Sequence, residues 1–326
     1  MSGMSWLLVL AALILAGLGA TALLAHGEAR WHASTRALLL RLQGTRLPPI
    51  QLRYDSAQLV GLPAPVQRYF RTVLRDGQAI ILSASVEQVG TFNLHPSTNK
   101  WKPFTAVQWV QTRRPGFIWD ARIRIAAGIS VFVHDAYLDG GGVLNPAVLG
   151  LFSLAGEVDE GALAEGEFVR FFAEAAWYPT ALLPSQGVRW TEVDDRSARA
   201  TLADGRISTT MLVRFDAAGL IESVCVEARP AMVGNRFVAT PWEGRWSNYY
   251  EQDGMLIPRD AEVAWLHADG PEPYWRGSMS EVSYEFAEPV GAGHRVGQVS
   301  ADLAGTLPPR LLRGWSSARS GVADKA

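Results

Sequence analysis

Residues 116–126 read GFIWDARIRIA, and the polarity of their side chains alternates. Every second side chain is apolar: Phe117, Trp119, Ala121, Ile123 and Ile125. Most of the side chains between them are charged: Ile118, Asp120, Arg122 and Arg124. Because successive side chains of a β-strand point to opposite faces, this period of two predicts a strand with one buried and one solvent-exposed face.

The same alternation recurs along the chain after Ile80. It is visible in FTAVQWVQT (104–112), TTMLVRF (209–215), LIESVCVEA (220–228), RWSNYYEQ (245–252) and AEVAWLHA (261–268). Asp204-Gly205 and Asp253-Gly254 separate such runs and favour two-residue hairpin turns, and residues 216–219 suit a longer hairpin loop. Strands joined by hairpins form an antiparallel meander, so the sequence predicts a mainly β (α+β) fold built on a large, curved antiparallel sheet.

One helix is predicted to interrupt this sheet, from about Glu157 to Ala176, and to lie on it as a lid. Its apolar residues follow helical spacing: Phe168, Phe171, Phe172 and Ala175. Its opposite face is charged: Glu160, Glu167, Arg170 and Glu174. Arg170 can reach both Glu167 and Glu174, which is ordinary pairing on the surface of a helix.

Residues 6–24 read WLLVLAALILAGLGATALL, without a charged residue or a proline. At about 1.5 Å per residue, such a helix spans roughly 28 Å, close to the hydrocarbon thickness of a bilayer. A cleaved signal peptide is the alternative, but no Lys or Arg precedes the run and its apolar core is long for that class. We therefore expect a retained single-pass anchor in the cell membrane.

The orientation of this anchor stays open. Arg30, Arg36 and Arg41 follow the apolar run, which by the positive-inside rule favours a cytoplasmic domain. A long domain can nevertheless be translocated regardless of such charges.

Breaks in composition suggest four parts. Residues 1–25 are interpreted as the anchor, 26–60 as a juxtamembrane helix and linker, 61–288 as the β-rich domain, and 289–326 as a Gly-rich, disordered tail. Pro48-Pro49 ends the juxtamembrane helix, and a short helix is expected between Pro63 or Pro65 and Arg75.

Several function classes lack their signatures. The 326 residues include 30 basic and 32 acidic ones, a net charge of −2, and no basic run indicates a nucleic-acid surface. The six His show no metal-ligand spacing and Cys225 is the only cysteine, so we predict no metal, no cofactor and no intrachain disulfide. Gly140-Gly141-Gly142 is interpreted as a turn, and the GxSxG motif of serine hydrolases is absent.

Aromatic residues supply the best candidate site. Twelve Trp occur in the chain, and residues 241–276 are especially rich in aromatic side chains. On paired strands some of these could line a mostly apolar pocket with a few polar anchors, although a Trp-rich core is the plainer interpretation. The predicted ligand-binding residues are Trp119, Arg170, Trp177, Trp242, Glu243, Trp265, Tyr274 and Arg276.

Three functions remain open from the residues alone. The leading hypothesis is a membrane-tethered binding protein for a lipid or other apolar ligand in the concave face of the sheet. The alternatives are a hydrolase that uses Glu167, Glu174 or Glu243 as acid or base, and a non-catalytic component of an envelope complex whose protein partner is unknown. The absence of nucleophile, metal and nucleotide motifs favours a protein that is not an enzyme.

Several segments also resemble a known family. GLPAPVQRYFRTVL, FTAVQWVQTRRPGFIWDARI, GEFVRFFAEAAWYPTALLP and the run from PWEGRW through PEPYWRG are similar to an uncharacterised bacterial family of membrane-anchored proteins, over about Gly61 to Glu285. This resemblance implies no activity. More loosely, the hairpin-rich sheet with one helix is similar to lipoprotein-carrier folds, which implies a half-barrel with a helical lid over an apolar cavity.

Overall fold

The computed structural model describes residues 3–94, 99–154, 156–159, 161–234 and 236–288. Residues up to Ala287 form one compact unit, to which the following paragraphs refer. The tail predicted over 289–326 lies outside the described residues.

The described strands form one 14-stranded sheet in which every pair is antiparallel. Its first half contains β1 (Ile81–Asn93), β2 (Trp101–Gln111), β3 (Gly116–Ala126), β4 (Ile129–Leu138), β5 (Gly141–Val148), β6 (Phe152–Ser153) and β7 (Glu157–Asp159). Its second half contains β8 (Arg189–Asp194), β9 (Ser197–Asp204), β10 (Ile207–Phe215), β11 (Ile221–Val233), β12 (Arg236–Gln252), β13 (Met255–His267) and β14 (Gly270–Phe286). The predicted mainly β fold is therefore confirmed.

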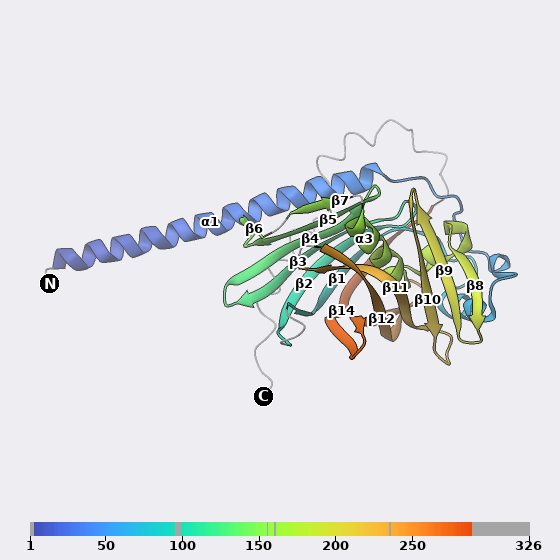
Figure 1. The fold of residues 1–326 in the computed structure, drawn as a ribbon. Helices are drawn as coiled ribbons and strands as arrows, with labels where there is room; N and C mark the ends of the chain where they lie inside the picture. Colours follow the sequence, from blue (N-terminus) through green and yellow to red (C-terminus); the bar gives the residue numbers. More distant parts are fainter. Residues whose placement is uncertain (1–2, 95–98, 155, 160, 235, 289–326) are drawn as a thin grey trace. The chain divides into compact units, whose positions relative to one another are not determined.

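Each half is a meander of hairpins, and the two halves meet in the middle, where β1 pairs with β14. Hairpins are present at both predicted turns: Asp204 ends β9 opposite Ile207, so that Gly205 begins the turn, and Asp253-Gly254 joins β12 to β13 with Gln252 opposite Met255. Between the halves, α3 (Ala162–Ala173) carries the chain from one edge of the sheet to the other (Figure 1). Short 3₁₀ helices then lead to β8: η3 (Glu174–Trp177), η4 (Pro179–Leu182) and η5 (Pro184–Gln186).

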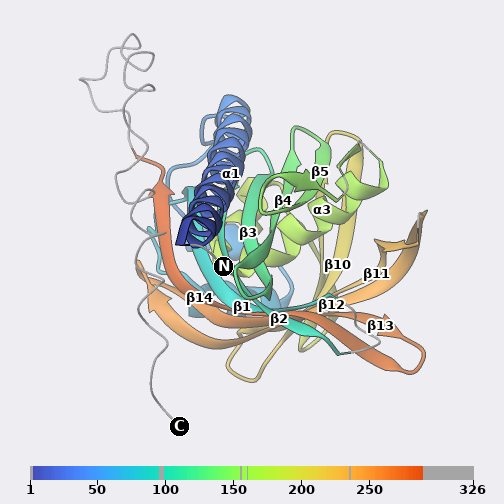
Figure 2. The same ribbon diagram turned by 90° about the vertical axis from the view of Figure 1, so that its left-hand side faces the viewer.

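The sheet is strongly curved and surrounds α3 (Figure 2). We call the face that contacts α3 the inner face and the opposite face the outer face. The inner face and α3 share the main hydrophobic core, in which Phe168, Phe171, Phe172 and Trp177 are almost completely buried. The helix lies so close to β5 that a Cβ atom on Gly142 would come within 2.7 Å of the α3 backbone, which explains one glycine of the Gly140–Gly142 triplet.

A second short helix, α2 (Ala64–Val73), closes one end of this core, where the sequence predicts a helix beginning near Pro63. It follows η1 (Ser56–Leu59). The α2 side chains Val66, Tyr69 and Phe70 are buried, and the Tyr69 and Phe215 rings lie 5.6 Å apart. This contact joins α2 to the inner face of β10.

Most of the predicted exposed face of residues 116–126 is buried, and only Arg124 of its charged residues is exposed. Asp120 and Arg122 are 4% and 7% exposed, because the C-terminal half of α1 (Gly3–Gly44) packs on the outer face of β3. Trp31 and Thr35 of α1 donate hydrogen bonds of 2.9 and 2.8 Å to Asp120, and the Trp31 ring stacks on His134 at 3.9 Å. The strand pattern was predicted correctly, but the helix that covers its polar face comes from far away in the sequence.

The predicted lid helix is also shorter and more buried than expected. Residues before it form β7, and the Asp159 carboxylate accepts hydrogen bonds from Gly161 and Leu163, so the helix begins at Ala162. The expectation of a solvent-exposed charged face was wrong: Glu167 and Glu174 are 6% and 9% exposed. The curved sheet reaches around α3, so that both its apolar and its charged sides meet strands.

Candidate functional site

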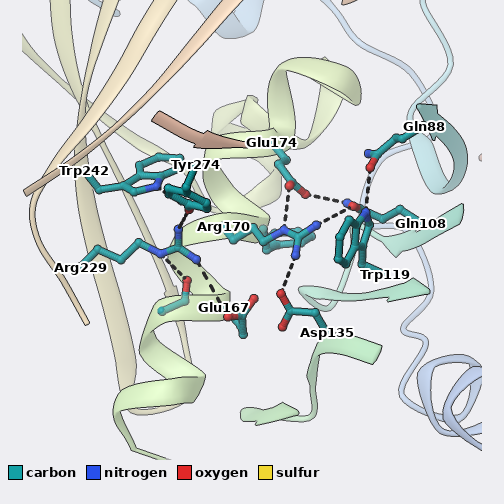
Figure 3. A network of polar contacts seen from close by, with 12 residues as sticks. Gln88, Gln108, Trp119, Asp135, Glu167, Arg170, Glu174, Arg229, Trp242 and Tyr274 are labelled. Carbon is teal, nitrogen blue, oxygen red and sulfur yellow. Dashed lines mark hydrogen bonds and ion pairs between the residues drawn. The ribbon is translucent and has the colours of Figure 1, made fainter. Parts of the chain in front are cut away.

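Arg170 of α3 lies at the centre of a polar network between the helix and the inner face of the sheet (Figure 3). Its guanidinium donates hydrogen bonds to Glu174 Oε1 at 2.8 Å, to Asp135 Oδ2 of β4 at 2.7 Å and to Gln108 Oε1 of β2 at 3.2 Å. Gln108 in turn donates to Glu174 Oε2 at 2.6 Å. The predicted pairing of Arg170 with Glu174 is present, and it extends into the sheet.

Arg229 of β11 makes a second polar link to α3, about one turn closer to its beginning. It donates hydrogen bonds to the carbonyl oxygen of Gly166 at 3.1 Å and to the Tyr274 hydroxyl at 3.0 Å, and it lies 3.9 Å from Glu167 Oε1. The Trp242 indole donates to the same hydroxyl at 2.9 Å. Arg229 therefore ties the helix to an aromatic group on β12 and β14.

Both guanidinium groups lie over aromatic rings of the sheet. The Arg170 guanidinium is 4.9 Å from the Phe117 ring and 5.0 Å from the Trp119 ring. The Arg229 guanidinium is 5.0 Å from the Trp242 ring and 5.6 Å from the Trp265 ring, and Trp265 stacks on Tyr274 at 5.6 Å. Such cation–π contacts are worth about 0.5–2 kcal/mol each, depending on their desolvation.

Glu167, which is buried, and Asp135, which is partly buried, form a pair of carboxyl groups between these two arginines. Burial raises the pKa of Glu167 well above its usual value, the neighbouring Asp135 charge raises it further, and Arg229 and Arg170 only partly oppose this. If all the acids of the network were ionised, three negative charges would face two positive ones. A proton on Glu167 balances the charge, so the network is neutral with Glu167 protonated.

The two predicted tryptophans nearest α3 are buried. Trp119 is 3% exposed and donates a hydrogen bond of 2.8 Å to Gln88, whereas Trp177 is 1% exposed and lies edge-on to Trp246 at 5.2 Å. Within the described residues, neither the Trp177 indole nitrogen nor that of Trp246 has a hydrogen-bond partner. Buried donors without partners are uncommon, and each costs about 1–3 kcal/mol.

The structure thus brings together six of the eight predicted ligand-binding residues and separates the other two. Trp119, Arg170, Trp177, Trp242, Trp265 and Tyr274 lie around α3 and the inner face. Glu243 and Arg276 follow Trp242 and Trp275 directly in their strands, so they point to the outer face. There Glu243 pairs with Arg245 at 2.7 Å and Arg276 with Glu262 at 2.5 Å.

The outer face holds its own open groove of about 600 Å³. Strands β11 to β14 and β1 line it, and its polar side chains include Glu222, Arg245, Asp260, Glu262 and Arg276. Asp260 accepts hydrogen bonds from Asn248 and Ser278. Within this groove Arg276 pairs with Glu262, whereas Arg245 pairs with Glu243 beside it.

The three carboxylates of the hydrolase hypothesis are not all together: Glu167 and Glu174 both lie beside Arg170, whereas Glu243 does not. Glu174 has both oxygens in hydrogen bonds, and Glu243 is on the outer face, beside the Cys225 thiol at 3.5 Å. Glu167 is the one of the three that combines a raised pKa with a place on the inner face. Among the described residues, no group of His, Cys, Asp or Glu is arranged to hold a metal ion.

Sequence reasoning missed Gln108, Asp135 and Arg229. Gln108 and Asp135 are single polar residues on otherwise apolar faces of their strands, and Arg229 follows Glu227 in a polar stretch, so none of them belongs to a recognisable motif. Only the crossing of α3 over β2, β4 and β11 turns these positions into partners of one network. A polar residue on the same face as apolar neighbours, such as Gln108 between Ala106 and Val110, was the available signal.

Residues 60–284 match the Family of unknown function (DUF6920). The chain belongs to this family. Membership confirms the resemblance to an uncharacterised family, with almost the same boundaries as the sequence motifs. The comparison with curated proteins found no match.

Some solved structures are similar to part of this DUF6920 chain. An outer membrane lipoprotein-sorting protein domain from Vibrio parahaemolyticus is 7% identical, with a TM-score of 0.36, covering 64% of this chain and 87% of its own. A LolA superfamily protein from Nitrosomonas europaea is 11% identical, with a TM-score of 0.34, covering 69% and 94%. A DUF1329 family protein from Desulfovibrio piger is also 11% identical, with a TM-score of 0.35. The first of these proteins is described as a lipoprotein-sorting protein, the class that the second sequence resemblance names.

Proposed function

We propose that this DUF6920 protein is a membrane-tethered binding protein for a lipid or other apolar ligand that occupies the inner face of the sheet. The apolar part of α1 is long enough to cross a membrane. In this proposal α1 holds the chain there, and α3 is a lid that moves to admit the ligand between itself and the sheet.

The main support for the proposal is that arginine side chains cover the aromatic rings of the inner face. The guanidinium group of Arg170 lies over Trp119, and that of Arg229 lies over Trp242 and Trp265, so two buried charged groups link these rings to α3. Replacing a buried ion pair by apolar residues is often neutral or stabilising, so stability alone is a weak reason for such an interface. Polar links can break and reform, so they suit a helix that must move away from the sheet to admit a ligand.

The buried donors support the same interpretation. The indole nitrogens of Trp177 and Trp246 lie in the aromatic core beside α3, where they lack a partner among the described residues. A ligand with an ester or carboxyl oxygen would satisfy such donors while its hydrocarbon part covers the rings. At about 25 cal/mol per Å² of apolar surface, burying an acyl chain would offset apolar contact that α3 loses when it moves away from the sheet.

Native mass spectrometry of the full chain after gentle detergent extraction tests this function. We expect an adduct with the mass of a lipid, in a 1:1 ratio, that survives the activation energy at which detergent and loosely bound lipids leave α1. Protein at its bare mass under these conditions would contradict the proposal. Bare protein that instead carries a tightly bound second protein would favour the envelope-complex alternative.

A further inference from the structure

The two edges of the sheet differ in what they expose. At one edge, Phe152 of β6 and Leu154 just after it are each 61% exposed. At the other edge, β8 presents charged side chains: Arg189, Glu192 and Asp194. Soluble proteins protect sheet edges with charges, as β8 does. The β6 edge lacks this protection, which indicates that something apolar covers it.

The β6 edge is fixed against α1 just beyond its apolar run. Gly27 is the first buried residue of the helix among those whose side chains are described. A Cβ atom on Gly27 would lie 2.4 Å from the Leu149 carbonyl oxygen and 2.7 Å from Leu151 Cγ, so only glycine permits this approach. One turn later, Arg30 donates a hydrogen bond of 3.3 Å to the Leu151 carbonyl oxygen. The turn of residues 149–151, which leads into β6, therefore lies beside Gly27, at the same height along the axis of α1.

That level lies in the headgroup layer of the bilayer. Gly27 comes three residues after Leu24, the last residue of the apolar run, which is about 4.5 Å along the helix axis. A bilayer of about 40–45 Å with a hydrocarbon core of about 30 Å leaves roughly 5–7 Å of headgroups on each side. A tilt of α1 toward the side that carries the turn brings the turn closer to the hydrocarbon.

We infer that Phe152 and Leu154 insert into the interface of the same bilayer that holds α1, so that the β6 edge is a lipid-docking surface. This inference rests on the membrane anchor of the proposed function. The β3–β4 hairpin joins the surface: Leu149 donates a backbone hydrogen bond of 3.0 Å to Ser130, and Ile129 at the tip is 40% exposed. Figure 1 shows this hairpin pointing toward the N-terminal end of α1.

Docking at this edge sets the orientation of the domain. Two attachments, the helix and the β6 edge, hold it against rotation about α1, whereas a single flexible tether would not. The β8 edge and α2 then point away from the lipid. The occupant is the lipid surface itself, because aliphatic and aromatic side chains beside a basic residue such as Arg30 suit the boundary between headgroups and acyl chains.

Depth-dependent fluorescence quenching tests this surface in the full chain. Cys225 is replaced (Cys225→Ser), and a single cysteine is placed at Phe152, Leu154, Val60 or Leu18 for labelling with an environment-sensitive dye. Val60 is the matched control, since it is an apolar residue that is 84% exposed next to η1, well beyond the C-terminal end of α1. Leu18 reports on the anchor. Each protein is reconstituted into vesicles of phosphatidylcholine and phosphatidylglycerol, with or without spin-labelled lipid as quencher.

We expect the dye at Phe152 and Leu154 to show a blue-shifted emission and a loss of intensity with the quencher, whereas the dye at Val60 keeps its intensity. Quenching at Leu18 without quenching at Phe152 and Leu154 would overturn the docking surface and leave the anchor intact. No quenching at Leu18 would overturn the anchor itself, and with it both the docking surface and the tethering part of the proposed function.

Discussion

The Trp31 indole nitrogen donates a hydrogen bond of 2.9 Å to Asp120 Oδ1, joining α1 to the third strand of the sheet across 89 residues of sequence. Both side chains are buried, and Thr35, one turn later, donates to the other oxygen of the same carboxylate. The apolar N-terminal helix is thus not a loose leader on this domain. Its C-terminal half is part of the folded structure and covers the outer face of β3.

Replacing this carboxylate should destabilise the protein. Burial alone would raise the pKa of Asp120, but the neighbouring His134, Arg122 and Trp31 outweigh it and lower the pKa to about 2. A lowered pKa stabilises the fold above the usual pKa of the group, 3.8, and this contribution disappears as the pH falls toward 2. We expect D120N to reduce the free energy of unfolding at pH 7 by roughly 2 kcal/mol. Thermal unfolding in detergent measures this, with D269N at an exposed turn as the control. Equal midpoints for both variants would contradict it.

The stability of the packing of α3 on the sheet should depend on pH through the protonation of Glu167. Its pKa is raised by burial and by Asp135, so the protonated form belongs to the closed structure. A raised pKa means that this stabilisation is present at low pH and is lost as the pH rises through the pKa in the folded state. We expect the amide protection of α3 in hydrogen exchange, corrected for intrinsic rates, to fall with rising pH in the natural protein but not in E167Q. The exposed Glu165 on the same helix supplies the control E165Q. The same pH dependence in E167Q as in the natural protein would refute this assignment.

Removing Arg229 should loosen α3 at its N-terminal half. R229M deletes the bonds to Gly166 and Tyr274 and leaves Glu167 without its partner. Because Glu167 is protonated, R229M also leaves the ionised Asp135 and Glu174 facing a single positive charge, that of Arg170. Leaving a buried charge without its counter-charge typically costs about 3–5 kcal/mol, so chemical denaturation should show a large loss for R229M. R229M/D135N restores the charge balance and should recover part of this loss. If the double variant is no more stable than R229M, Arg229 acts through its hydrogen bonds and packing rather than through its charge. R276Q on the outer face is the control, because Arg276 is exposed beside Glu262.

Ligand retention should separate binding aromatics from core aromatics. Trp242 and Trp265 lie under Arg229 and beside α3, whereas Phe215 packs against Tyr69 and Trp190 at the α2 end of the core. We expect W242A and W265A to lose the co-purifying lipid in native mass spectrometry, and F215A to keep it at a similar loss of melting temperature. If all three lower the melting temperature alike and retain the lipid, Trp242 and Trp265 belong to the core alone.

Much of the architecture was determined by local sequence patterns. Alternation of polarity around Trp119, Asp-Gly turns such as Asp204-Gly205, and the proline before α2 identify strands, hairpins and a helix start, because each depends on side chains within a few residues of one another. The length and composition of residues 6–24 likewise identify a helix that could cross a membrane. These properties need no knowledge of which elements become neighbours.

Which residues come together in the candidate site was decided by the tertiary structure. Asp120 and Glu167 look like solvent-facing residues in their own strand and helix, and they are buried only because α1 covers the outer face and the sheet curves around α3. Alternation along β12 and β14 places Glu243 and Arg276 on one face of their strands. Only the position of α3 shows that this is the outer face, away from the site. Local sequence determined which side chains share a face; long-range packing decided which faces meet, because that choice is made by contacts between residues far apart in the chain.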